Sequence, residues 1–301
     1  MSSITAKLDS MRWKRFALLF LLPLSLFSVI YFHKVDALAW HLLKSHVLHK
    51  THEGLSLNLD QYRVEIEARP ISGIDDDLSG LTYNTETHTL FSVLNGQPLI
   101  VELGLDGQML RKIKVEGVRD MEGITHVDGK RYVVATESDQ KLILLQIDND
   151  TEAVDAAPAP QIGLGITSSG NNKDFEGVSW DDRNRRLLVA KERNPLKIIE
   201  ITGFIPDGNE AIRQLHITPI ATAGFLNLKL RDFSSITYHD ASGHLVILSD
   251  ESRMAAEYDF EGRAVSALSL WRGFHGLKKK RSTSRGDRHW TGWQGLCCER
   301  T

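Results

Sequence analysis

Six acidic residues stand at fixed distances from a small residue that recurs along the chain, at Gly80, Gly123, Gly177 and Ser235. An Asp lies three residues before each small residue, and a Glu lies directly before the second and third. These acids are Asp77, Asp120, Asp174, Asp232, Glu122 and Glu176. Clustered carboxylates raise one another's pKa unless a cation or hydrogen-bond donors compensate their charge. Oxygen ligands without cysteine suit Ca²⁺ or Mg²⁺. We therefore predict a metal site, with Ca²⁺ as the candidate ion, at Asp120, Glu122, Asp174, Glu176 and Asp232.

A second group of polar residues lies 14 to 16 positions after the same small residues, at the ends of apolar segments. Asn95 holds this position in the first repeat, and the later repeats have Glu137, Glu192, Asp250 and Glu251. We predict that these four acids and Asp77 lie at the mouth of a central channel. A structural interpretation competes with the metal site, because an Asp before a turn commonly caps backbone N–H groups. The sequence leaves both open.

The sequence contains none of the common nucleophile or phosphate-binding motifs. It has no G-x-S-x-G, no P-loop and no H-E-x-x-H, and no cysteine precedes residue 297. Catalytic residues are therefore unknown, although carboxylates alone can support metal-assisted hydrolysis. A phosphate-ester hydrolase would also need cations near the mouth, and Lys173, Lys191 and Arg193 are candidates by their position in the chain. The sequence does not decide between a binding module and a Ca²⁺-dependent phosphoesterase.

The elements that must position these acids are short strands in a repeat. From one small residue to the next the steps are 43, 54 and 58 positions, and each repeat contains alternating or apolar segments bounded by turn residues. Repeats of this size indicate propeller blades, since a single four-stranded sheet cannot bury both of its faces. We predict an all-β propeller of five blades, with six possible, spanning residues 56–277. A β-sandwich is the alternative fold.

The turn positions give approximate bounds for four of the blades. The first blade runs from Leu78 to Val115, and the second runs from Met121 to a last strand near residues 161–166. The third starts at Phe175 and includes residues 197–201 and 216–218. The fourth starts at Phe233 and ends near residue 270. An isolated strand at residues 62–66 has no blade of its own, so we expect it to complete the last blade of the ring.

The N-terminal region predicts a membrane anchor. Residues 1–15 carry four Lys or Arg, and residues 16–32 contain no charged residue. Such a segment is just long enough to span a bilayer, and the basic residues favour a cytoplasmic N-terminus. A cleaved signal peptide is the alternative, because Ala37-Leu38-Ala39 resembles a cleavage site. Residues 33–55 are expected to form a juxtamembrane linker helix at the lipid surface; a metal site at its histidines, His41, His46, His49 and His52, is the alternative.

The tail differs from the rest of the chain. Residues 278–301 carry seven Lys or Arg, two Asp or Glu and both cysteines, so residues 1–277 have a net charge of −8. An acidic body disfavours nucleic acid as a partner. The tail lacks alternation, whereas a one-nucleotide frame shift can encode DPQAEGIAIGLDGKVYVVSEP over residues 281–301. That reading restores the repeat with its 14-residue spacing. We interpret the tail as aberrant, with a frameshift as the hypothesis and an incomplete last blade as the consequence.

The segments SGLTYN, RDMEGITHVDGKRYVVATES, FSSITYH and LWRGFHGL occur in this order between residues 79 and 277. With these motifs the chain resembles the SdiA-regulated, YjiK-like proteins. The resemblance implies a phytase-like β-propeller in a bacterium, anchored in the inner membrane by a single pass with its body in the periplasm. It implies no assigned activity. The expected partners are the lipid bilayer, through the N-terminal helix, and an envelope ligand or protein.

Overall fold

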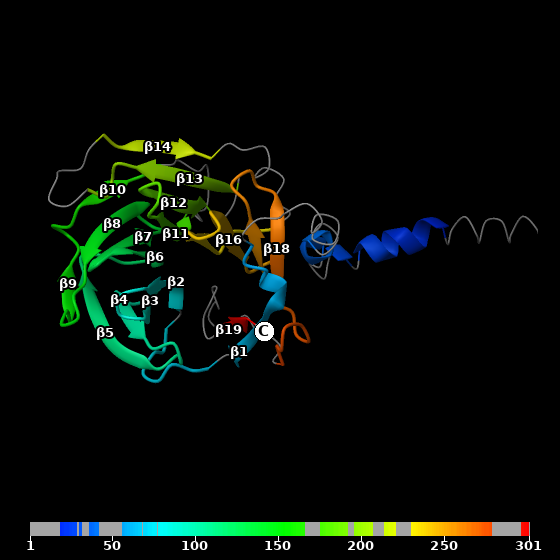
Figure 1. The fold of residues 1–301 in the computed structure, drawn as a ribbon, viewed down its shortest axis with the longest axis horizontal. Coiled ribbons are helices and arrows are strands. Elements are labelled where there is room, and N and C mark those ends of the chain that lie inside the picture. Colours follow the sequence, from blue (N-terminus) through cyan, green and yellow to red (C-terminus); the bar gives the residue numbers. More distant parts are fainter. Residues whose placement is uncertain are drawn as a thin grey trace, which may run out of the picture.

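A computed structural model of the chain shows β-sheets arranged in a ring around a common axis (Figure 1). It describes residues 19–28, 30–31, 36–41, 56–67, 69–76, 78–165, 175–191, 196–206, 214–220 and 230–278, and the backbone of residues 296–300. Strands run antiparallel within each blade as hairpins, with one parallel exception. This radial order confirms the predicted β-propeller class.

Blades one and two are joined because one strand from a connection within blade two is added to blade one. Blade one contains β2 (Leu78–Asn84), β3 (Thr89–Leu94), β4 (Leu99–Leu103) and β5 (Met109–Glu116). Blade two contains β6 (Met121–Asp128), β7 (Arg131–Thr136), β8 (Lys141–Gln146) and β10 (Gln161–Gly163). Between β8 and β10 the chain returns to blade one and adds β9 (Ala153–Asp155) parallel to β5. Residues 153–155 are therefore a strand within the segment that connects β8 and β10.

Blades three and four follow the predicted bounds. Blade three contains β11 (Phe175–Asp181), β12 (Arg186–Lys191), β13 (Lys197–Thr202) and β14 (His216–Pro219). Blade four contains β15 (Ser235–His239), β16 (His244–Ser249), β17 (Met254–Tyr258) and β18 (Ala264–Ser269). The turn residues and the strand alternation were therefore sufficient to place all four blades.

The predicted count of five or six blades is wrong for the part of the chain that the structure describes. Four sheets have four or more strands, and the remaining sheet has two. It pairs β1 (Tyr62–Glu67), which follows the short 3-10 helix η1 (Leu59–Gln61), with β19 (Leu296–Arg300). Within the described residues the isolated strand thus pairs with one strand, from the tail, and two strands are too few for a full blade. The frameshift stays a hypothesis, because residues 279–295 lie outside the described ranges.

The recurring small residues allow the first strands of successive blades to pack closely around the axis. These strands, β2, β6, β11 and β15, contact one another in order. A Cβ added to Gly80 would lie 2.9 Å from Gly123 Cα, and one added to Gly177 would lie 2.8 Å from the backbone nitrogen of Ile236. Real Cβ atoms do not approach backbone this closely, so the positions require glycine. Ser235 is the last of the series and carries a side chain.

The core lies between the blades. Phe91 of β3 packs with Tyr132 of β7 in one cluster, and Phe175 of β11 packs with residues of β7 and β12 in another. A third cluster joins blades three and four and includes Ala37, which lies in the helical residues 36–41. Part of the predicted linker helix therefore packs into the propeller. Among the helical residues in the described ranges, none forms a helix long and apolar enough to cross a bilayer.

Candidate functional site at the start of blade two

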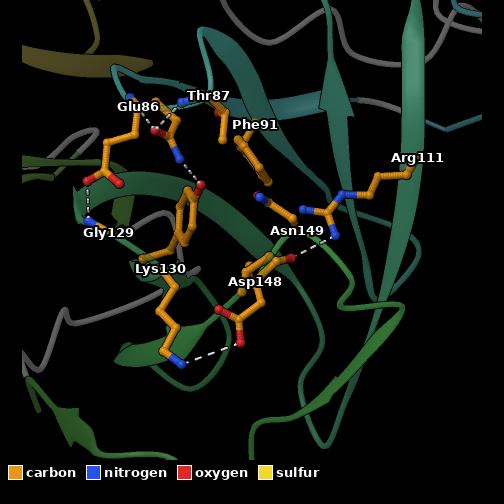
Figure 2. Close-up of a pocket in the computed structure, with 11 residues that line it drawn as sticks. Glu86, Thr87, Phe91, Arg111, Gly129, Lys130, Asp148 and Asn149 are labelled. Atoms are coloured by element: carbon orange, nitrogen blue, oxygen red, sulfur yellow. Dashed lines mark hydrogen bonds and ion pairs between the residues drawn. The ribbon is translucent and has the colours of Figure 1, made fainter.

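A cavity of about 500 Å³ lies between blades one and two, at the end of β2 (Figure 2). Its lining includes Asn84, Arg111, Lys130, Tyr132 and Asp148. Asn84 Nδ2 donates to Tyr132 Oη over 2.6 Å, and Arg111 Nη1 donates to Asp148 O over 2.8 Å. Lys130 Nζ lies 3.4 Å from an oxygen of Asp148. The polar groups of this cavity bind one another, and the lining does not select a class of ligand. No pattern in the sequence indicated this cavity.

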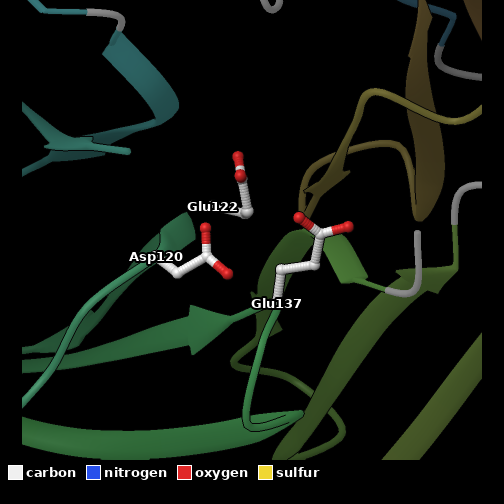
Figure 3. Close-up of side chains that lie close together, drawn as sticks. All are labelled: Asp120, Glu122 and Glu137. Atoms are coloured by element: carbon white, nitrogen blue, oxygen red, sulfur yellow. The ribbon is translucent and has the colours of Figure 1, made fainter. Parts of the chain in front are cut away.

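Three carboxylates gather at the opposite end of blade two. Side-chain oxygens of Asp120, Glu122 and Glu137 lie within 4.8 Å of one another (Figure 3). The sequence predicted the first two as metal ligands and the third as a mouth residue, and the structure brings them together. Glu122 is buried, whereas Asp120 and Glu137 are half-buried. We call these three residues the acidic cluster.

The local backbone explains how the acidic cluster forms. Asp120 adopts a left-handed conformation with a φ of 59° just before β6. Its carbonyl oxygen accepts a bond of 3.0 Å from Glu137 N, and its Oδ2 accepts a bond of 2.9 Å from Ser138 N. The start of β6 is thereby fixed to the end of β7. The β6–β7 register shifts between Met121 and Gly123, so Glu122 occupies a bulge.

Burial controls the protonation of Glu122. Only 5% of this residue is exposed, and desolvation raises the pKa of its carboxyl to about 7, with smaller contributions from the charges of Glu137 and Asp120. Hydrogen bonds from Ser79 and from Asn95 Nδ2 oppose this increase. Both donors belong to blade one, so Glu122 connects two blades. At neutral pH the carboxyl exchanges its proton readily.

The acidic cluster could hold a metal ion. Ca²⁺ binds oxygen at about 2.4 Å, so two ligand atoms on opposite sides of the ion are about 4.8 Å apart. The oxygens of Asp120, Glu122 and Glu137 satisfy this limit pairwise. A divalent cation would also compensate the repulsion that raises the pKa of Glu122. Donor chemistry and spacing therefore allow the acidic cluster to hold a metal ion.

Asp232 has a different environment in blade four. Its Oδ1 accepts a bond of 2.5 Å from Ser249 Oγ and one of 3.0 Å from Glu251 N. Its Oδ2 accepts a bond of 2.8 Å from Ser234 Oγ. Only 2% of Asp232 is exposed. These contacts fit the capping interpretation that the sequence left open, because hydroxyl and amide donors already stabilise the carboxylate.

The other predicted site residues divide into two groups. The acidic cluster does not include Glu176, a half-buried residue of β11, nor Asp250 and Glu251, which follow β16. Outside the described ranges lie Asp77, Asp174 and Glu192, and also the candidate phosphate-binding residues Lys173 and Arg193. Lys191 is described at the end of β12, where only 3% of it is exposed.

Sequence reasoning missed two partners of the acidic cluster, Ser79 and Asn95. Both belong to blade one, whereas the acids belong to blade two. A signal was present, because Asn95 holds the strand-end position that Glu137 holds in the next repeat. What the sequence could not show is that the strand end of one blade faces the first strand of the next.

The radial strand order and the acidic cluster at one end of the ring define a β-propeller protein with a candidate cation site. The profile of the SdiA-regulated family matches residues 55–286. The chain therefore belongs to the SdiA-regulated family, as its motifs indicated.

Three solved structures match the chain at low sequence identity and with TM-scores below 0.5. A nidogen/laminin complex matches with a TM-score of 0.44 and 13% identity, covering 69% of this chain and 74% of the other. A luciferin-regenerating enzyme matches with a TM-score of 0.42 and 12% identity, covering 70% and 80%. The propeller domain of Cps50 (Swd1) from Myceliophteria thermophila matches with a TM-score of 0.37 and 12% identity, covering 68% and 59%. The fold assignment depends on this chain's own strand order.

Proposed function

We propose that this chain is a membrane-anchored β-propeller of the bacterial envelope that binds a ligand at its channel mouth with the help of a divalent cation. The observation that carries the proposal is the acidic cluster, in which three carboxylates converge and the central one is buried. Such an arrangement is costly when all three groups are ionised. A bound Ca²⁺ offsets that cost and retains open coordination positions for an oxygen-rich ligand.

The proposed location is the inner membrane, with the propeller in the periplasm. Support comes from the basic residues before the uncharged segment 16–32 and from the exposed apolar side chains of residues 19–31. The burial of Ala37 and Leu38 in the propeller favours a retained anchor over cleavage after Ala39. We expect a C-terminal tag to be degraded by protease in spheroplasts and protected in intact cells. Protection in spheroplasts would contradict this topology.

Calorimetric titration tests the cation site. The full chain in detergent micelles is stripped with EDTA and titrated with Ca²⁺ and then with Mg²⁺. We expect one Ca²⁺ site, weaker by at least tenfold in Asp120→Asn and in Glu137→Gln. That factor is about 1.4 kcal/mol of binding free energy. Asp139→Asn is the matched control, because Asp139 is an exposed acid two residues beyond Glu137. The site would be refuted if the unmodified chain gave no heat of Ca²⁺ binding, or if Asp139→Asn lost as much Ca²⁺ affinity as the two cluster variants.

The alternative is a Ca²⁺-dependent phosphoesterase, and one observation favours it. The pKa of Glu122, raised to about 7, is suited to a general acid or base at neutral pH. In this alternative Glu122 transfers a proton and is not a calcium ligand, so calcium-loaded protein should hydrolyse a phosphate monoester, and Glu122→Gln should abolish turnover while Asp120 and Glu137 still bind Ca²⁺. Binding of Ca²⁺ without hydrolysis of the phosphate ester would favour a ligand-binding role for the channel mouth.

A further inference from the structure

The helical residues 19–28 and 30–31 expose apolar side chains. The exposed fractions are 69% for Leu19, 72% for Phe20, 66% for Phe27 and 54% for Tyr31. Figure 1 shows these blue residues extending away from the ring on the side of β18. A helix that exposes this much apolar surface requires an apolar environment outside the propeller.

The next described segment, residues 36–41, is part of the propeller. Ala37 is fully buried and belongs to the cluster between blades three and four, and His41 is 1% exposed. His41 Nδ1 lies 2.9 Å from Ala37 O, so this nitrogen carries the proton and donates. Burial lowers the pKa of His41, so the neutral ring accepts at Nε2 from the hydroxyl of Tyr258, over 2.6 Å. The segment is thereby hydrogen-bonded to β17.

Arg231 connects the exposed helical residues to this buried segment. Its Nε and Nη2 lie 3.2 Å and 2.9 Å from Asp36 Oδ1, and Nη2 also donates to Tyr31 O over 3.0 Å. The guanidinium carbon lies 5.0 Å from the centre of the Tyr31 ring. Arg231 itself is fixed by its backbone N–H, which donates to Ser252 Oγ over 3.0 Å. One side chain therefore sets the direction in which the helix leaves the propeller. We call Arg231, Asp36 and Tyr31 the anchor clamp.

Blade four also carries basic and aromatic side chains, after β16 and after β18. Arg253 follows the clamp's partner Ser252, and its guanidinium carbon lies 4.5 Å from the Trp271 ring centre. The loop after β18 continues with exposed Arg272, Phe274 and Lys278. Trp and Phe with Lys and Arg are the side chains that proteins place at the headgroup level of a bilayer. We call Arg253, Trp271, Arg272, Phe274 and Lys278 the rim patch.

We propose that the rim patch rests on anionic lipid headgroups and that the anchor clamp holds the propeller against the membrane in one orientation. The proposal rests on the membrane anchoring proposed above and adds the face that contacts the bilayer. Charge selects the occupant, because the three cations of the rim patch match anionic lipid and one of them, Arg253, directly follows Ser252, the partner of the clamp residue Arg231. The propeller then has a fixed membrane-facing side, on blade four.

Depth-dependent fluorescence quenching tests this orientation. The full chain, with Cys297 and Cys298 replaced by Ser, receives a single cysteine at Phe274→Cys, labelled with an environment-sensitive dye. Leu110→Cys on β5 is the matched control, because Leu110 is also exposed but lies on blade one. Both proteins are placed in phosphatidylcholine vesicles that contain phosphatidylglycerol and brominated lipid. We expect several-fold stronger quenching at position 274 than at position 110. We also expect this difference to shrink in Asp36→Ala and when phosphatidylglycerol is omitted.

Vesicle flotation separates the two proposals. Protein that fails to float with vesicles contradicts the membrane anchor itself. Protein that floats but shows equal quenching at the two positions overturns the rim patch and leaves the anchor intact. Asp36→Glu, which keeps the carboxylate, should restore the difference between the two positions. Because Asp36 is partly exposed, its variants are expected to fold, and an unchanged far-ultraviolet dichroism spectrum checks this. If the quenching difference between positions 274 and 110 is the same in Asp36→Ala as in the protein with an intact clamp, the clamp sets no orientation.

Discussion

The corners that begin blades two and four use the same chain positions for different purposes. Asp120 and Asp232 each stand three residues before the small residue. In blade four the position directly before the small residue is Ser234, whose hydroxyl donates to Asp232. In blade two that position is Glu122, which adds a buried carboxyl beside Asp120. A single change from hydroxyl to carboxyl thus distinguishes a capped carboxylate from a group of converging carboxylates.

The difference shows that a repeated acid does not by itself predict a ligand. A carboxylate with three donors around it has no need of a cation, whereas carboxylates that face one another do. The donors of Asp232 come from residues as far apart in sequence as Ser234 and Glu251. The distinction therefore depends on the neighbours of each acid.

The largest expected effect is on the blade-four corner. Asp232→Ala leaves two buried serine hydroxyls and the N–H of Glu251 without their acceptor, which should cost roughly 3 kcal/mol of unfolding free energy. Asp120→Ala removes one bond, to Ser138 N, and places Ala at a φ of 59°, but it relieves repulsion, so its loss should be about 1 kcal/mol. Urea unfolding of both variants in EDTA measures the difference. Equal losses would mean that the two corners are equivalent.

A smaller, pH-dependent effect is expected for Glu122→Gln. The pKa of Glu122 is about 7 in the folded chain and 4.5 ordinarily, so folded protein retains a proton that the unfolded chain releases between these values. Stability of the unmodified chain should therefore fall as the pH rises from 4.5 through 7. Without divalent cations, the variant should be more stable at pH 8 by on the order of 2 kcal/mol and equal below pH 4.5. Parallel pH profiles for the two proteins would contradict the raised pKa.

The smallest effect is expected when a glutamate is introduced into blade four, at the position that Glu122 holds in blade two. Ser234→Glu removes a donor from Asp232 and adds a negative charge beside it, which should cost about 1 to 2 kcal/mol in EDTA. Calcium should recover part of this loss, as measured by the thermal midpoint with and without the ion. Gln146→Glu, on the exposed side of β8, is the control for added charge and should change little. If Ca²⁺ restores none of the lost stability, a carboxylate at the position of Glu122 is not sufficient to form a cation site.

The sequence predicted much of this architecture, for identifiable reasons. Gly80, Gly123 and Gly177 mark the blades because the first strands pack closely, leaving no room for a Cβ at Gly80 and Gly177 and little at Gly123. Asp120, Glu122 and Glu137 were identified by the same repeat. The blade count failed because β1 and β19 pair only with each other within the described ranges. The capping of Asp232 and the role of Asn95 depend on contacts between distant strands, which a repeat pattern does not specify.

The return of the chain to blade one as β9 has a consequence for unfolding. Lys114, Val115 and Glu116 are in register with Ala153, Val154 and Asp155, so a segment of the blade-two connection is hydrogen-bonded into its neighbour. Separating these two sheets requires rupture of main-chain bonds as well as of side-chain packing. The first half of the ring should therefore open as one cooperative unit, with amides of β5 and β8 exchanging with deuterium at a common rate.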